Sequence, residues 1–115
     1  MPTVKATREG LVGQTTASGY VIDRVVRFVA LPSTKAIHDP RSVRVTSCLT
    51  GRSCLAQVLD VGPHHTDDDG YVYGDRRPRA ESDPHSNRAG IDLSEAVHQA
   101  LGMTEDNGEV MWEWV

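Results

Sequence analysis

The stretch VRVTSCLTGRSCLAQVLDVGP, residues 43–63, decides the fold class. Val43 and Val45 alternate with polar residues, a pattern that is typical of a strand with one buried face. The Thr50-Gly51 pair predicts a tight turn, and residues 54–60 predict the strand that returns beside the first. This stretch therefore indicates an antiparallel β-hairpin.

Two cysteines, Cys48 and Cys54, flank the predicted turn. A two-residue turn makes them diagonal neighbours across the hairpin, and a three-residue loop makes them face each other. In both arrangements their Cα atoms fall within disulfide range. The alternative is a pair of reduced, half-buried thiols, and the sequence leaves the choice between the two states open.

Further short strands are predicted on both sides of the hairpin. Residues 25–31 form an apolar run rich in β-branched side chains, and residues 110–115 predict a closing strand. Residues 11–22, rich in Thr and Ser, also predict short strands, whereas residues 1–10 form an N-terminal segment. The chain is thus expected to be mostly β.

One helix is predicted over residues 92–101. Either Asp92 or Ser94 can cap its start, its apolar residues form one buried stripe, and Gly102 ends it. Six strands and one short helix in a chain of this length indicate a single domain, residues 1–115, closed into a small six-stranded barrel.

Residues 64–89 have little periodicity and several Gly or Pro breakers, so we expect one long surface loop there. His64, His65 and the acidic run at residues 67–69 lie within this loop, but their mixed ligand types and spacing do not indicate a zinc site. We therefore expect no metal and no cofactor.

Composition excludes several classes of protein. The 115 residues carry a net charge of −4 with a pI near 5.6, which argues against a nucleic-acid partner. No stretch is apolar enough to cross a membrane, and we expect no membrane partner. Residues 1–10 lack the apolar core of a signal peptide, so a protein acting outside the cytoplasm would be phage-encoded or trimmed of its leader. The oligomeric state stays open.

Four segments, in order, resemble the rare lipoprotein A domains: TASGYVID at residues 16–23, the hairpin at residues 43–58, LDVGP at residues 59–63, and GIDLSEAVHQALGM at residues 90–103. Residues 91–94 also resemble the FDLS segment of expansins. The resemblance implies a double-psi β-barrel that acts on peptidoglycan or another wall polysaccharide. It also implies a location in the cell wall, the periplasm or outside the cell.

Asp60 and Asp92 are the catalytic candidates in the matched segments. Asp60 precedes a Gly-Pro exit and Asp92 stands at the start of the predicted helix, so we expect both carboxyl groups to open onto one groove. Glycoside cleavage uses such a pair. The helix dipole is expected to keep Asp92 ionised and to leave Asp60 as the general acid. The alternative is structural, with both residues acting only as turn and helix caps.

The chain departs from the family pattern at one point. Tyr20 stands where rare lipoprotein A enzymes have a Glu, and Leu31 falls near the place of their His. The resemblance then implies that Thr16, Tyr20 and Asp23 contact the sugar. Because Tyr is a poor base near neutral pH, two functions stay open: a lytic transglycosylase or glycoside hydrolase, and a non-catalytic, expansin-like glycan-binding or structural module.

Four aromatic side chains are candidates for stacking on sugar rings: Tyr71, Tyr73, Trp112 and Trp114. Tyr71 and Tyr73 lie in the long loop, and the two Trp residues share one face of the predicted last strand. The alternative is that these rings pack in the core or at a protein interface, because aromatic side chains dominate both. A barrel that binds another protein and no sugar is the third reading.

Overall fold

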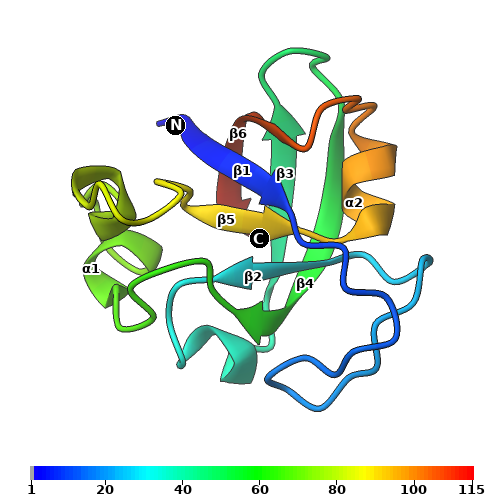
Figure 1. Cartoon of the computed structure of the whole chain (residues 1–115), viewed down its shortest axis with the longest axis horizontal. Coiled ribbons are helices and arrows are strands. Elements are labelled where there is room, and N and C mark those ends of the chain that lie inside the picture. Colours follow the sequence, from blue (N-terminus) through cyan, green and yellow to red (C-terminus); the bar gives the residue numbers. More distant parts are fainter. Residues whose placement is uncertain (1) are drawn as a thin grey trace.

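Six strands close into a barrel in the order β1-β5-β2-β4-β3-β6 in a computed structural model that describes residues 2–115 (Figure 1). The strands are β1 (Val4–Arg8), β2 (Phe28–Leu31), β3 (Ser42–Ser47), β4 (Ser53–Val61), β5 (Ile91–Leu93) and β6 (Asn107–Trp114). The short helices of the described chain are α1 (Asp69–Val72), α2 (Glu95–Ala100) and the 3-10 turns η1 (Ala36–His38) and η2 (Arg79–Ser82). The predicted small β-barrel is confirmed.

The interior of the barrel is filled by apolar side chains from alternate positions along the strands. Val43 and Val45 of β3 and Val29 and Leu31 of β2 belong to one apolar core, together with Val110 of β6. β1 pairs in parallel with β5 and β2 pairs in parallel with β4, whereas the other neighbours are antiparallel. Among residues 2–115, the closed order leaves no strand edge unpaired. Figure 1 shows β1, β5 and β2 side by side on the near wall of the barrel.

The predicted helix is shorter than expected at its start. Ile91 and Leu93 point into the core as strand β5, so Asp92 belongs to a strand and not to the helix. Ser94 caps α2, and its hydroxyl accepts a hydrogen bond from the backbone N–H of Val97. The prediction that a helix dipole acts on Asp92 is therefore wrong. The strand was not predicted because three residues show too little alternation of apolar and polar side chains.

The N-terminal half also differs from expectation. Residues 4–8 form β1, whereas residues 11–22 are irregular apart from one bridge between Thr15 and Val21. The Thr- and Ser-rich composition of residues 11–22 indicated strands, but turns there satisfy the backbone locally. The resulting segment between β1 and β2, residues 9–27, runs along one side of the barrel (Figure 1).

The region expected to be one long loop, residues 64–89, contains α1 and η2. Tyr71, Val72 and Ala80 are buried and attach it to the barrel. The acidic and His residues near its start are not grouped as metal ligands, since no cluster of at least three such side chains exists among residues 2–115.

The cysteines lie in neither of the two predicted arrangements, as diagonal neighbours or as facing residues. Cys54 lies on β4 opposite Val45 and is buried, whereas Cys48 lies in the turn beyond β3 and is exposed. Thr46 pairs with Ser53, so the connection between the strands is longer than two or three residues. Both thiols are free. The turn is thus longer than either predicted turn, and the disulfide itself stays a prediction.

Candidate functional site

A β-bulge places Asp60 on the outer face of the barrel. Val58 pairs with Val29 and Asp60 pairs with Ala30, so Leu59 is an extra residue on β4. Without this insertion, the two-residue period would direct Asp60 inward like Val58. The bulge therefore turns a carboxylate away from the core and towards solvent.

Asp92 lies on the same face as Asp60. Both residues pair with Ala30, Asp60 from β4 and Asp92 from β5, and laterally paired residues project to one side of a sheet. Two strand spacings put their Cα atoms about 10 Å apart. The small Ala30 side chain between them leaves room for both carboxyl groups.

Glu9 is a third carboxylate at this site, and the sequence did not single it out. It follows β1, where its N–H donates to the Leu93 carbonyl at 2.8 Å. The two-residue period puts Glu9 on the outer side with Thr7, whose hydroxyl donates to Asp92. We name Glu9, Asp60 and Asp92 the carboxylate site.

The pKa of Glu9 is raised well above its ordinary value. Partial burial, the negative charge of Asp60, a hydrogen bond to Asp60 and the charge of Asp92 together raise the pKa of Glu9 from 4.5 to about 8. As a carboxylate, Glu9 leaves its buried Oε2 without a hydrogen-bond partner among the described residues. A protonated Glu9 can instead donate to Asp60. This arrangement is an acid beside a carboxylate.

Asp92 is less free to ionise than the sequence suggested. Burial raises its pKa and the charge of Asp60 adds to this, although the Thr7 hydroxyl bond opposes the shift. The His64 imidazole, like the Thr7 hydroxyl, acts to lower the pKa of Asp92. The backbone at Gly62 lies close to Asp92. A Cβ atom at this position would lie only 3.3 Å from Asp92 Oδ2. The backbone thus leaves the Asp92 carboxyl room.

The TASG segment folds over Asp60. The N–H groups of Ala17 and Val61 each donate to Asp60 Oδ1 at 2.9 Å, so this carboxylate holds the loop against the end of β4. Thr16 is buried, and its hydroxyl accepts from the Tyr20 N–H at 3.1 Å. Asp60 thus has the capping role that the sequence offered as the alternative, in addition to its place beside Glu9.

Tyr20 and Asp23 lie in the same segment but contact each other rather than the carboxylate site. The Tyr20 hydroxyl lies 3.5 Å from Asp23 Oδ2, while Asp23 Oδ1 accepts the N–H groups of Val25 and Val26, both at 2.8 Å. These backbone bonds lower the pKa of Asp23. Its direct contacts are those of a turn cap, and its predicted sugar contact stays a prediction.

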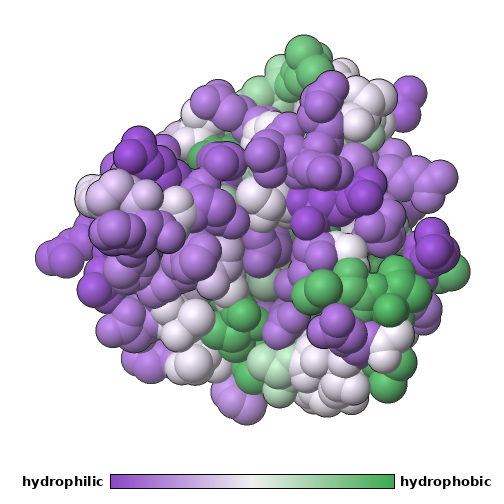
Figure 2. All heavy atoms as spheres, in the orientation of Figure 1, coloured by the Kyte–Doolittle hydropathy of each residue, from purple (hydrophilic) through white to green (hydrophobic). Residues whose placement is uncertain are grey.

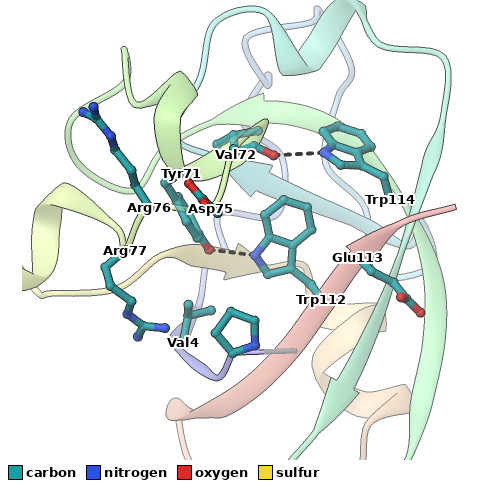
Figure 3. A pocket seen from close by; sticks show the side chains of 11 residues that line it. Val4, Tyr71, Val72, Asp75, Arg76, Arg77, Trp112, Glu113 and Trp114 are labelled. Atoms are coloured by element: carbon teal, nitrogen blue, oxygen red, sulfur yellow. Dashed lines mark hydrogen bonds between the residues drawn. The ribbon is translucent and has the colours of Figure 1, made fainter.

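The four aromatic residues form one connected cluster away from the carboxylate site. Trp112 and Trp114 pack edge to face at 5.8 Å, Tyr71 packs edge to face against Trp112, and Tyr73 stacks on Trp114 at 5.4 Å. Tyr71 is only 7% exposed, and burial raises its pKa above its usual 10. This cluster attaches α1 to β6, and three of its members, Tyr71, Trp112 and Trp114, also line a cavity (Figure 3).

A patch of exposed apolar side chains lies on the segment between β1 and β2. Leu11, Val12, Val21 and Val25 are 49%, 43%, 59% and 82% exposed. Figure 2 shows hydrophobic surface at the lower right, where this segment runs in the same orientation. Among residues 2–115, no helix is long and apolar enough to cross a bilayer.

Solved structures share this fold. The Streptomyces papain inhibitor matches over 99% of this chain and 93% of its own, with 22% identity and a TM-score of 0.59. A point mutant of Clavibacter michiganensis expansin in complex with cellohexaose matches 99% of this chain and 50% of its own, with 18% identity and a TM-score of 0.57. Cerato-platanin 3 from M. perniciosa matches 99% and 94%, with 10% identity and a TM-score of 0.58.

These matches confirm the double-psi β-barrel, the fold of these structural neighbours. At such identities they establish the fold alone, and this chain spans half of the expansin chain. No curated protein matches the sequence. One family pattern does match, over residues 2–85, which is well over half of the chain. The chain therefore belongs to the family DUF8814, a domain of unknown function.

Proposed function

We propose that this domain binds a cell-wall polysaccharide on the outer face of β1, β5, β2 and β4 and cleaves it with the carboxylate site. The observation that carries the proposal is the grouping of Glu9, Asp60 and Asp92 on one face of the barrel, where burial and the neighbouring carboxylates raise the pKa of Glu9 to about 8. Glycosidases use such a combination of one protonated and one ionised carboxyl group. Peptidoglycan glycan is the first substrate to test, because the sequence resembles rare lipoprotein A domains.

In the proposed reaction Glu9 is the general acid. Its proton passes to the glycosidic oxygen as the bond to the anomeric carbon breaks, so that the leaving sugar departs as an alcohol. Asp60 or Asp92 stabilises the positive charge that develops on the sugar ring. Water, or a hydroxyl of the same sugar, completes the reaction and returns a proton to Glu9. This assigns to Glu9 the acid role expected of Asp60.

Two further observations support a glycan ligand. The expansin with this fold was solved with cellohexaose, a β-linked glucan. The TASG segment is held against Asp60 by the Ala17 N–H, so the carboxylate site has a preformed wall. A wall polysaccharide other than peptidoglycan therefore stays within the proposal.

The test is digestion of purified sacculi, with soluble products analysed by mass. Wild type is expected to release muropeptides, and Glu9→Gln is expected to release about 100-fold less, because general acid catalysis contributes roughly that much. Glu105→Gln is the matched control, since Glu105 is exposed and its side chain makes no described contact. If wild type sediments with sacculi but releases nothing, the domain is a non-catalytic binding module.

A second function is favoured by the apolar patch between β1 and β2. The Streptomyces papain inhibitor matches this chain along nearly its full length, and an exposed apolar loop is suited to enter a protease cleft. In this alternative the domain inhibits a papain-like protease. Val25→Asp is then expected to weaken inhibition of papain, whereas Leu49→Asp, 87% exposed in the β3–β4 turn, leaves it unchanged. Absence of papain inhibition by wild type excludes this alternative.

A further inference from the structure

A cavity beside α1 and β6 lies apart from the carboxylate site. It measures about 330 Å³ and is formed by the start of β1, the end of β6, α1 and the loop that follows α1. Val4 and Glu9 are five residues apart on or just after β1, so roughly 16 Å separates this cavity from the carboxylate site. Its volume is near the lower end of small-molecule pockets, which is room for one ring rather than a chain.

The floor of this cavity is a preorganised aromatic surface. The Trp112 indole N–H donates to the Tyr71 hydroxyl at 2.6 Å, and Tyr71 in turn donates to the Gly90 carbonyl at 3.0 Å. The Trp114 indole N–H donates to the Val72 carbonyl at 3.0 Å. Both indole N–H groups are therefore used inside the protein, and Figure 3 shows Trp112 across the middle of the pocket. Tyr73 stacks on Trp114 and the Arg41 guanidinium lies over the same ring, so Trp112 is the indole that offers its carbon surface to a ligand.

The polar groups of the cavity are mixed in charge. Asp75 and Arg76 both line it, and neither side chain has a hydrogen bond or an ion pair with another residue in the range 2–115. Arg77 and Glu113 are paired with Glu81 and Arg44. Figure 3 shows the Arg76 guanidinium directed away from Trp112, so the unpaired Asp75 carboxylate supplies the hydrogen-bond acceptors that suit hydroxyl groups.

We propose that this cavity binds one neutral sugar ring of the same polysaccharide. The apolar C–H face of the ring stacks on Trp112, while Asp75 accepts hydrogen bonds from its hydroxyl groups. The inference rests on the proposed function, since it makes the cavity a subsite at a distance from the carboxylate site. Such a subsite holds the chain in place while another part of it lies at Glu9.

The test uses the fact that the chain has two Trp residues and that both line this cavity. Titration with cellohexaose or the hexamer of N-acetylglucosamine is expected to shift tryptophan emission saturably. Asp75→Ala is expected to weaken this binding about tenfold or more, because one hydrogen bond to a charged group is lost. Glu105→Ala, another exposed acid without a side-chain contact, is the matched control and is expected to bind like wild type.

The outcomes separate the two proposals. Sedimentation with insoluble polysaccharide measures binding anywhere on the protein, whereas tryptophan emission reports on the cavity. If wild type sediments but its emission does not change, or if Asp75→Ala binds the hexamers like wild type, the subsite is wrong and the proposed function stands. If wild type neither sediments with nor cleaves any wall glycan, the proposed function fails and the subsite fails with it.

Discussion

Asp60 faces the outside of the barrel although Val58, two residues earlier on the same strand, faces the core. The bulge at Leu59 makes the difference, and it brings Asp60 to the same side as Asp92 with Ala30 between them. A carboxylate directed inward at this position would have no charged partner in the apolar core. The local irregularity of β4 therefore builds the carboxylate site.

Asp60→Asn is expected to reduce glycan cleavage by about 100-fold or more while leaving the fold intact. Asparagine keeps an oxygen that can accept from the N–H groups of Ala17 and Val61, so the TASG loop stays in place. The amide removes the negative charge that helps hold the proton on Glu9. Product release from sacculi measures the first effect and thermal melting the second; full activity of the variant would exclude Asp60 from the reaction.

Glu9 is expected to make the stability of the domain depend on pH. Its pKa of about 8 in the folded protein exceeds its ordinary 4.5, so folding favours the protonated form. The stabilisation is fully present below about pH 4.5 and is lost as pH rises through 8. Wild type should therefore melt at a lower temperature at pH 9 than at pH 5.5. Glu9→Gln should lose much of this slope, although the raised pKa of Asp92 acts in the same direction.

Melting curves of the two proteins between pH 5.5 and pH 9 check this expectation. Glutamine imitates the protonated acid, so the variant should be at least as stable as wild type at the alkaline end. If the melting temperatures of wild type and Glu9→Gln depend equally on pH, the pKa of Glu9 is not raised in the folded protein. The assignment of Glu9 as the general acid would then fail.

Much of the barrel could be predicted from the sequence because its central strands have clear patterns. The alternation Val43, Val45 on β3 and the apolar run ending at Leu31 on β2 correspond to buried positions in the structure. β5 was missed because three residues, Ile91–Leu93, carry too little alternation to compete with the helical pattern that follows. Pairing with β1 and β2 makes it a strand, and that information is not local.

The carboxylate site was only partly predictable for a related reason. Asp60 and Asp92 lie in segments that resemble motifs of rare lipoprotein A domains, whereas Glu9 lies in an N-terminal segment with no motif. Its role depends on a parallel pairing between β1 and β5 that joins residues more than eighty positions apart. An acidic residue just beyond an alternating Val4, Ala6 pair was the only signal in the sequence, and it is a weak one.

Ser94→Ala is expected to destabilise the domain by about 2 kcal/mol or more. Ser94 is fully buried, and its hydroxyl accepts from the N–H groups of Phe28 and Val97 and donates to the Val26 carbonyl. Alanine leaves these groups without a partner and removes the cap of α2. Urea unfolding measures the loss. Ser53→Ala is the control, because Ser53 is exposed and makes no described side-chain bond; equal stability of the two variants would contradict the capping role.

The two thiols are expected to differ in reactivity. Cys48 is exposed in the β3–β4 turn, whereas Cys54 faces the core opposite Val45 and burial raises the pKa of its thiol. Because the thiolate is the reactive form, a thiol reagent at pH 8 should modify Cys48 rapidly and Cys54 only after unfolding. Cys48→Ser should remove the rapid phase, and Cys54→Ser should leave it unchanged. Mass analysis after mild oxidation completes the test: an intact Cys48–Cys54 bridge, with no thiol left to react, would show that the hairpin adopts the shorter turn in which the two residues meet.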